Sequence, residues 1–287
     1  MTRVKRGLVL EGGAMRGLFT AGVLDVWMEN GITFDGIIGV SAGAAFGVNY
    51  KSGQIGRTVR YNKKYCRDKR FCGIRSLLRT GDIFGVRFCY DTLPHELDVY
   101  DVQAFRENPT EFYTVSTDVK TGKPHYHLCL DGDTETLDYI RASASMPFVS
   151  RPVSVEGLTL LDGGISDSIP LAYFESIGYN RNIVVLTQPK GFVKRRVRMR
   201  PLVRLALRRY PEAARAMCRR HEFYNETLRL IAEKEAKGEI LVIRPDAPLP
   251  IGHISRDPER IDLVYRLGRE VAERELDRLR TFLDKSE

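Results

Sequence analysis

The sequence of 287 residues has no long hydrophobic run, because charged residues interrupt every apolar stretch well short of the roughly eighteen residues of a membrane-spanning helix. The basic residues at positions 1–6 imitate the start of a signal peptide, but the apolar run that follows ends at Glu11 and is too short for an export signal. Cysteine is scarce: there are five, an odd number, with no C-x-x-C pair, which excludes a disulfide framework. We therefore expect a soluble, cytoplasmic protein with free thiols.

Acidic residues are almost missing from one part of the chain. Residues 190–220 hold twelve Lys and Arg residues and one acid, Glu212, so this part alone accounts for the net charge of +8. The charge is local, so nucleic acid is not an expected partner of the whole fold. In the segment from Lys194 to Arg220, apolar residues alternate with arginines around Pro211, which is typical of peripheral contact with an anionic membrane. A basic helix hairpin that is merely solvated on its outer side is the alternative.

Short apolar segments alternate with helical patterns in the first half of the chain. Two strand–turn–helix units follow one another, and they predict a parallel sheet with helices packed on its faces. One long amphipathic helix is expected over residues 257–283. We expect a core over residues 5–190 and a mostly helical C-terminal part, residues 191–287, packed on the same domain. The expected strands cover residues 7–10, 34–40, 111–117, 125–130, 158–161, 182–186 and 239–243.

The strongest local pattern is Gly39-Val40-Ser41-Ala42-Gly43, a G-x-S-x-G sequence between an expected strand and an expected helix. It is typical of a nucleophile elbow, in which Ser41 has a strained backbone and Gly39 and Gly43 leave room for the strand and the helix. The hydroxyl then projects above the sheet beside a helix N-terminus, which favours a developing oxyanion. The alternative is an ordinary turn in which Ser41 caps the helix.

A second glycine-rich turn follows the first expected strand and contains Gly12, Gly13, Ala14, Arg16 and Gly17. Its first three backbone amides are candidates for an oxyanion site, to which Arg16 adds positive potential or bracing. Dinucleotide binding is the competing interpretation. It fits poorly, because Ala14 stands where the fingerprint has its second glycine and the acidic residue expected about twenty positions later is misplaced.

A third turn, Asp162-Gly163-Gly164, ends the strand expected at residues 158–161. A carboxylate at this place should face the same sheet edge as Ser41, because ligand sites in such sheets lie beyond the carboxyl ends of the strands. An Asp-Gly turn without any function is the alternative. Together the three turns supply a nucleophile, a base and oxyanion donors at one edge of the sheet.

The three motifs resemble those of the patatin-like phospholipases, including small bacterial members. The resemblance covers roughly residues 5–190. Residues 141–147 (RASASMP) and 164–170 (GISDSIP) also look like that family. The resemblance implies a three-layer α/β/α fold with a mostly parallel central sheet. It also implies a Ser–Asp dyad without a catalytic histidine, with Ser41 as the nucleophile and Asp162 as its base.

The resemblance further implies the activity, a lipid acyl hydrolase of the phospholipase A or lysophospholipase type that forms an acyl-enzyme. No metal or other cofactor is implied, and an acyl lipid is the expected substrate. The amides around Gly12, Gly13 and Ala14 hold the oxyanion in this picture. The chain departs from the family at Ala14, where a third glycine is usual and where the turn favours a residue with positive φ.

Two other functions are compatible with the residues. A Ser–acid–His triad needs a histidine after Asp162, and His253 lies in a plausible loop, whereas His221 follows two arginines that disfavour its protonation. Ala14 is the one sequence feature that favours a catalytically impaired, membrane-associated or regulatory protein on the same fold.

Weaker patterns involve further histidines and serines. One face of an expected strand carries three possible zinc ligands but no evident fourth, so no metal site is expected; the three are His125, His127 and Cys129. Ser143 and Ser145 are expected to be structural, since no glycine-flanked elbow surrounds either.

Overall fold

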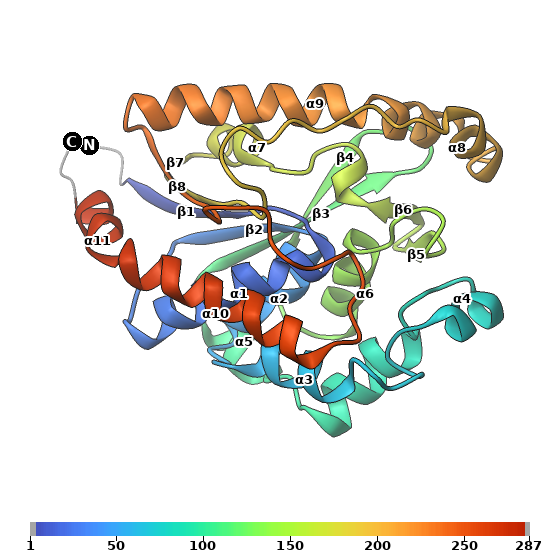
Figure 1. The fold of residues 1–287 in the computed structure, drawn as a ribbon, viewed down its shortest axis with the longest axis horizontal. Helices are drawn as coiled ribbons and strands as arrows, with labels where there is room; N and C mark the ends of the chain where they lie inside the picture. The colour runs from blue at the N-terminus through green and yellow to red at the C-terminus, as the bar shows by residue number, and fades with distance from the viewer. Residues whose placement is uncertain (1–3, 285–287) are drawn as a thin grey trace.

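A computed structural model describes residues 4–284, and a mixed eight-stranded sheet runs through its middle (Figure 1). The spatial order of seven strands is β5-β6-β3-β2-β1-β7-β8, and β4 pairs with β3 off this path. Neighbours from β3 through β2, β1 and β7 to β8 are parallel, whereas β4 and β6 run antiparallel to β3 and β5 antiparallel to β6. The strands are β1 (Lys5–Leu10), β2 (Gly36–Val40), β3 (Glu111–Asp118), β4 (Pro124–Cys129), β5 (Val153–Val155), β6 (Leu158–Asp162), β7 (Tyr179–Val185) and β8 (Ile240–Ile243).

Helices cover both faces of the sheet, so the predicted three-layer α/β/α fold with a mostly parallel sheet is confirmed. In Figure 1, α7 and α9 lie above the sheet, and α1, α2 and α10 lie below it. The α-helices are α1 (Gly17–Glu29), α2 (Ala42–Lys51), α3 (Arg57–Tyr65), α4 (Ile74–Thr80), α5 (Val102–Glu107), α6 (Thr134–Ser143), α7 (Leu171–Ser176), α8 (Arg200–Ala206), α9 (Pro211–Ala236), α10 (Pro258–Arg274) and α11 (Leu276–Asp284). Shorter 3-10 turns are η1 (Ala14–Arg16) and η3 (Gly163–Ile165), and η2 (Phe88–Leu97) is π-helical.

A hydrophobic core forms on each face of the sheet because successive strand side chains point to opposite faces. Leu8 and Leu10 of β1 pack into the core that contains the α1 and α10 side chains. Val9, between them, packs into the second core with Phe174 of α7 and Tyr224 of α9. The continuous apolar runs of the central strands are therefore buried on both sides, as in other parallel sheets.

The C-terminal helix α10 packs closely on α1. A Cβ atom added at Gly22 of α1 would lie 2.1 Å from the Tyr265 carbonyl oxygen, and one added at Gly268 of α10 would lie 2.0 Å from the Phe19 carbonyl oxygen. Glycine at both positions lets the two backbones approach. A division of the chain near residue 190 stays a prediction, although this packing ties the C-terminal helices to the first helix of the core.

The single helix expected over residues 257–283 is wrong in one respect. The chain bends at Glu275, which separates α10 from α11. The bend brings Leu279, Phe282 and Leu283 into the core beneath the sheet, where all three are buried. Burial of these side chains outweighs continuation of a straight helix. No helix within residues 4–284 is both long and apolar enough to cross a bilayer.

Candidate active site

Ser41 lies at the turn between β2 and α2 with φ +53° and ψ −118°, a strained backbone conformation for a residue with a side chain. The flanking glycines are required by close approaches. A Cβ atom at Gly39 would lie 2.6 Å from the Ala44 nitrogen, and one at Gly43 would lie 2.5 Å from the Leu10 carbonyl oxygen. The chain thus has the local geometry of a nucleophile elbow at the position where the sequence pattern places it.

Residues 141–147 hold both ends of the site in place. The Ser41 N–H donates to Ser143 Oγ at 2.9 Å, and the Ser143 hydroxyl donates to the Val115 carbonyl at 2.6 Å. Two residues further on, the Ser145 carbonyl accepts from the Asp162 N–H at 2.9 Å. Ser143 is completely buried, so this expected structural serine positions the elbow directly.

Asp162 reaches the elbow by a different route from the one expected. The prediction assumed that its strand runs parallel to β2, but β6 is antiparallel to β3. β3 extends past the end of β2, and the register places Asp162 opposite Ser116, one residue beyond the pair formed by Val40 and Val115. The carboxyl end of β6 therefore points back into the sheet and stops level with Ser41.

Asp162 is 2% exposed, and its surroundings oppose ionisation of its carboxyl group overall. Burial raises its pKa to about 6, while Arg220, a hydrogen bond with the Ser41 hydroxyl and the Gly164 N–H act in the opposite direction. The Gly164 N–H donates to Asp162 Oδ1 at 2.7 Å. Ser41 and Asp162 are thus brought together, and the carboxyl group has the pKa of a weak base that is ionised at neutral pH.

A buried carboxylate anchors the glycine-rich turn. Glu11 is 1% exposed, and its Oε2 accepts from the Thr187 N–H at 2.6 Å and from the Thr187 hydroxyl at 3.1 Å. Its Oε1 accepts from the Tyr224 hydroxyl at 2.5 Å. The first residue of the turn is therefore fixed to the end of β7 and to α9.

The turn itself lines the cavity beside Ser41. The N–H groups of Gly12 and Gly13 donate to no acceptor among residues 4–284, so both are free to donate to a ligand in the cavity. Ala14 adopts φ +49°, so alanine occupies the left-handed conformation that a third glycine would otherwise hold. Gly17 packs behind the turn, where an added Cβ atom would lie 2.8 Å from the Ala42 Cβ.

These residues open into a cavity of about 590 Å³. Ser41, Asp162 and Gly164 line it at the sheet edge. Gly163 packs behind the carboxylate, where an added Cβ atom would lie 2.1 Å from the Val115 carbonyl oxygen. Most of the remaining wall is apolar, and its buried members include Phe46, Phe71, Ile83, Leu93 and Ile140.

Four cations also line the cavity: Arg16, Arg141, Lys194 and Arg220. The sequence pattern predicted that Arg16 adds positive potential at the glycine-rich turn, but it assigned Lys194 and Arg220 to an outer surface that faces the membrane. Composition shows that a segment is basic but does not show which of its side chains turn inward. The sequence does not reveal that Arg220 lies near Asp162, where its charge partly opposes the rise in the pKa of the carboxyl group that burial causes.

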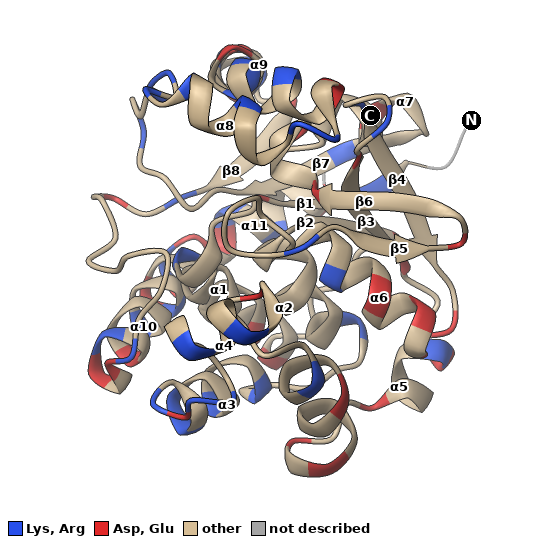
Figure 2. Cartoon of the chain, turned by 90° about the vertical axis from the view of Figure 1, so that its right-hand side faces the viewer, with Lys and Arg blue, Asp and Glu red and all other residues tan. Residues whose placement is uncertain are grey.

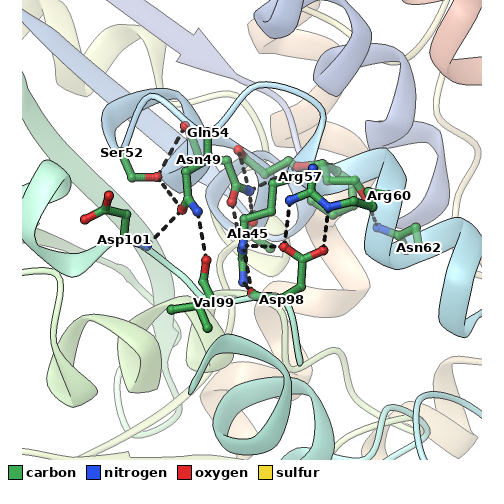
Figure 3. Close-up of polar contacts among 12 residues, drawn as sticks. Ala45, Asn49, Ser52, Gln54, Arg57, Arg60, Asn62, Asp98, Val99 and Asp101 are labelled. Carbon is green, nitrogen blue, oxygen red and sulfur yellow. Dashed lines mark hydrogen bonds and ion pairs between the residues drawn. The ribbon is translucent and has the colours of Figure 1, made fainter. Parts of the chain in front are cut away.

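A polar network secures one wall of the cavity (Figure 3). Arg57 donates to the Asp98 backbone carbonyl through Nη2 at 2.6 Å and to Asn49 Oδ1 at 2.8 Å. Arg60 makes a two-pronged contact with the Asp98 carboxylate, at 2.8 Å to each oxygen. Asp98 follows η2, which contributes Leu93 to the cavity, so the network ties this wall to α2 and α3.

The histidines lie apart from the dyad. His253 is exposed at the cavity rim and makes no hydrogen bond with Ser41 or Asp162, all three being described residues. The zinc trio on β4 does not assemble, because the Cys129 thiol faces Thr114. His127 instead groups with two carboxylates, and the possible ligand atoms lie within 4.8 Å of one another: His127, Glu135 and Glu156.

An α/β/α sandwich with a serine at a strained strand-to-helix turn, beside a buried aspartate at one sheet edge, defines the class of this protein. A family model described as patatin-like phospholipase matches residues 8–175, more than half of the chain. The chain belongs to this family, as predicted, and membership supports lipid acyl hydrolysis as its general activity. A second model, described as a domain of unknown function (DUF6363), matches residues 210–284.

The chain is similar to several individual proteins. The uncharacterized protein YjjU of Escherichia coli K12 is 31% identical over 281 residues, which cover 91% of this chain and 74% of that protein. Lysophospholipases nte1 of Emericella nidulans and Aspergillus niger are each 31% identical over 60% of this chain, which spans 11% of their length. Among solved structures, VipD from Legionella pneumophila has a TM-score of 0.48 and 13% identity, covering 96% of this chain and 67% of that one.

Proposed function

We propose that this protein hydrolyses carboxylic ester bonds of acyl lipids, as a phospholipase A or lysophospholipase, through a dyad of Ser41 and Asp162. The observation that carries the proposal is that the strained Ser41 and the buried Asp162 line one cavity at the sheet edge, where the Ser41 hydroxyl opposes the rise in the pKa of Asp162. The apolar cavity in front of the pair supports an acyl substrate. The lysophospholipase relatives support the same substrate class.

The proposed reaction has two half-reactions. Asp162 accepts the hydroxyl proton while Ser41 Oγ attacks the ester carbonyl carbon, and the oxyanion accepts hydrogen bonds from the amides at Gly12, Gly13 and Ala14. Collapse breaks the ester C–O bond, and the departing alcohol takes the proton from Asp162. Water then gives a proton to Asp162 and attacks the acyl-enzyme, releasing the fatty acid and restoring the serine. No metal or organic cofactor enters either step.

The pKa of Asp162 predicts how the reaction rate falls on the acid side of the pH–rate profile. A general base works best with a pKa near the operating pH, and a pKa of about 6 leaves this carboxyl group ionised above neutrality. We expect kcat/KM to fall about tenfold per pH unit below about pH 6, as the carboxylate becomes protonated. A profile that stays flat to about pH 4 would show that a different base is used.

The structure gives no support to the two alternatives from the sequence. A Ser–Asp–His triad requires a histidine bonded to the carboxylate, and His253 makes no such bond within the described residues. The impaired-protein alternative depends on a turn distorted by Ala14, but Ala14 adopts the positive φ that the turn requires. Both observations favour the active dyad.

Hydrolysis of a monoacyl phospholipid by matched variants tests the proposal. Ser41→Ala and Asp162→Asn should each reduce kcat by about 10³-fold or more, whereas His253→Ala should change it by less than about threefold. Circular dichroism checks that each variant is folded. A loss in His253→Ala equal to that in Ser41→Ala would replace the dyad by a triad.

Peripheral contact with an anionic membrane is proposed for the outer part of the basic segment, residues 194–220. Residues 194–199 are not helical, α8 is short, and Pro211 begins α9. Met199, Leu202 and Leu205 are 60%, 45% and 64% exposed, and Figure 2 shows basic residues over α8 and α9. Such a surface suits insertion of apolar side chains among anionic headgroups.

Vesicle sedimentation tests this contact. Binding to anionic vesicles should weaken strongly as salt rises from about 0.01 M to about 1 M, because the screening length falls from about 30 Å to about 3 Å. Leu205→Ser should weaken binding further at each salt concentration. Binding that does not respond to salt would contradict an electrostatic contact.

The five unpaired cysteines support the expected cytoplasmic location.

A further inference from the structure

Three of the four cations that line the cavity, Arg16, Lys194 and Arg220, come from separate parts of the chain. Arg16 belongs to η1, Lys194 to the irregular segment before α8, and Arg220 to α9. Lys194 and Arg220 lie outside the residues matched by the patatin-like model, and Arg220 lies within the domain of unknown function. All three are half-buried and line the cavity next to the dyad. The C-terminal part of the chain thus adds positive charge to the proposed active site.

These cations have few protein partners. Within residues 4–284, none of their side chains forms an ion pair within 4 Å or donates a hydrogen bond. Arg16 Nε and Arg220 Nε are buried without a partner, and Lys194 Nζ lies 4.1 Å from the centre of the Tyr224 ring. Burying guanidinium N–H groups without acceptors costs free energy that a bound anion would offset.

Two acidic groups face this cluster, and within residues 4–284 neither forms an ion pair with it closer than 4 Å. Glu11 is occupied by Thr187 and Tyr224, and Asp162 by Gly164 and the Ser41 hydroxyl. Burial is the main cause that lowers the pKa of Lys194 to about 8, and Arg220 and Arg16 add to this effect while Glu11 opposes it. The neighbouring cations therefore repel one another, and this repulsion ends when an anion binds between them.

The cavity has two chemically different ends. Arg16, Lys194 and Arg220 come from η1, the segment before α8 and α9, whereas most of the apolar wall comes from α2, η2 and α6, which also contributes Arg141. Ser41 lines the same cavity at the sheet edge, at the start of α2. An ester held at Ser41 with its acyl chain in the apolar end directs its alcohol portion toward the cations.

The cavity is large enough for one acyl chain. Each water-sized group occupies roughly 30 Å³, so a cavity of about 590 Å³ holds about twenty such groups. That is the size of one long acyl chain.

We infer that Arg16, Lys194 and Arg220 form a subsite for the phosphate of a single-chain phospholipid, on the alcohol side of the ester that Ser41 attacks. This inference rests on the proposed function for the orientation of the ester. Phosphate matches the donors, because guanidinium groups bind its oxygens with paired N–H groups and the ammonium adds a point charge.

Calorimetric titration of the Ser41→Ala protein tests the subsite without turnover. The ligands are a monoacylglycerol phosphate and the monoacylglycerol with the same chain, both below their micelle concentrations. The phosphate should tighten binding about 10- to 100-fold, the range for a charge-assisted hydrogen bond. Adding Lys194→Met should remove most of this preference and leave the neutral ligand within about twofold of its original affinity. Lys190→Met, an exposed neighbour on the same segment, is the matched control and should change neither.

Equal binding of the two ligands, or a preference that survives Lys194→Met, would overturn the subsite. Inorganic phosphate identifies the source of the anion. It should compete only weakly, and binding as tight as that of the lipid phosphate would instead indicate a site for free phosphate. Turnover by the wild-type protein separates the two proposals. Hydrolysis of both esters without a binding preference refutes the subsite alone, and a binding preference without hydrolysis refutes the proposed function alone.

Discussion

Replacing Asp162 by asparagine should abolish activity and at the same time stabilise the folded protein. The carboxyl group is buried, and its pKa is raised from 3.8 to about 6, chiefly by loss of solvation. Asparagine has nearly the shape of the protonated carboxyl group and keeps the oxygen that accepts from the Gly164 N–H. The substitution therefore removes a buried charge without removing this contact.

The pKa shift gives the expected magnitude. One pKa unit corresponds to about 1.4 kcal/mol, so ionised Asp162 lowers the free energy of unfolding by about 3 kcal/mol when the pKa rises from 3.8 to about 6. Because the folded state binds the proton more tightly than the unfolded state, stability falls as pH rises through the window between these values. Attraction to Arg220 is already included, since it lowers the same pKa.

Urea unfolding at two pH values measures the effect. Asp162→Asn should raise the free energy of unfolding by about 2–3 kcal/mol at about pH 8 and by almost nothing near pH 4. Asp277→Asn, at a side chain that is 99% exposed, serves as the control and should change stability by less than about 0.5 kcal/mol at both. A loss of stability in Asp162→Asn at the higher pH would refute the assignment of a destabilising buried charge.

Three further substitutions test other parts of the account. Ala14→Gly should raise the unfolding free energy by about 0.5–1 kcal/mol, because glycine adopts positive φ without strain; a loss in urea unfolding would contradict this. Ser143→Ala leaves the Ser41 N–H and the Val115 carbonyl unpaired, so it should cost about 2 kcal/mol and slow acylation at least tenfold, and an unchanged acylation rate would argue against positioning of the elbow. Asp98→Ala leaves Arg57 and Arg60 without their counter-charge and should lower the free energy of unfolding by about 3 kcal/mol in thermal or urea unfolding. A loss below about 1 kcal/mol would show that this network does not hold the cavity wall.

Local chemistry made the core of the site predictable. The elbow at Ser41 and the turn at Gly12 depend on glycines beside short apolar strands, and both features are visible in a few consecutive residues. The place of Asp162 was also predicted, although the reasoning assumed a parallel strand. Strand direction depends on pairing between distant segments, so no local pattern reveals that β6 is antiparallel.

The parts that were missed depend on contacts across the whole chain. Glu11 and Tyr224 are 213 positions apart, and their hydrogen bond exists only once α9 packs over the sheet. The inward direction of Lys194 and Arg220 has the same origin, because most basic residues in their segment face solvent. An amphipathic pattern predicts that the basic side chains of a segment face solvent on average. It does not show which of them turn inward.

Covalent labelling with a fluorophosphonate, followed by intact mass and peptide mapping, tests the central claim most directly. The Ser41–Asp162 dyad predicts one adduct per chain, on Ser41, that is absent in Ser41→Ala and forms about 10²-fold more slowly or worse in Asp162→Asn. An adduct on another residue, no adduct in folded protein mixed with lipid vesicles, or an unchanged labelling rate in Asp162→Asn would contradict it.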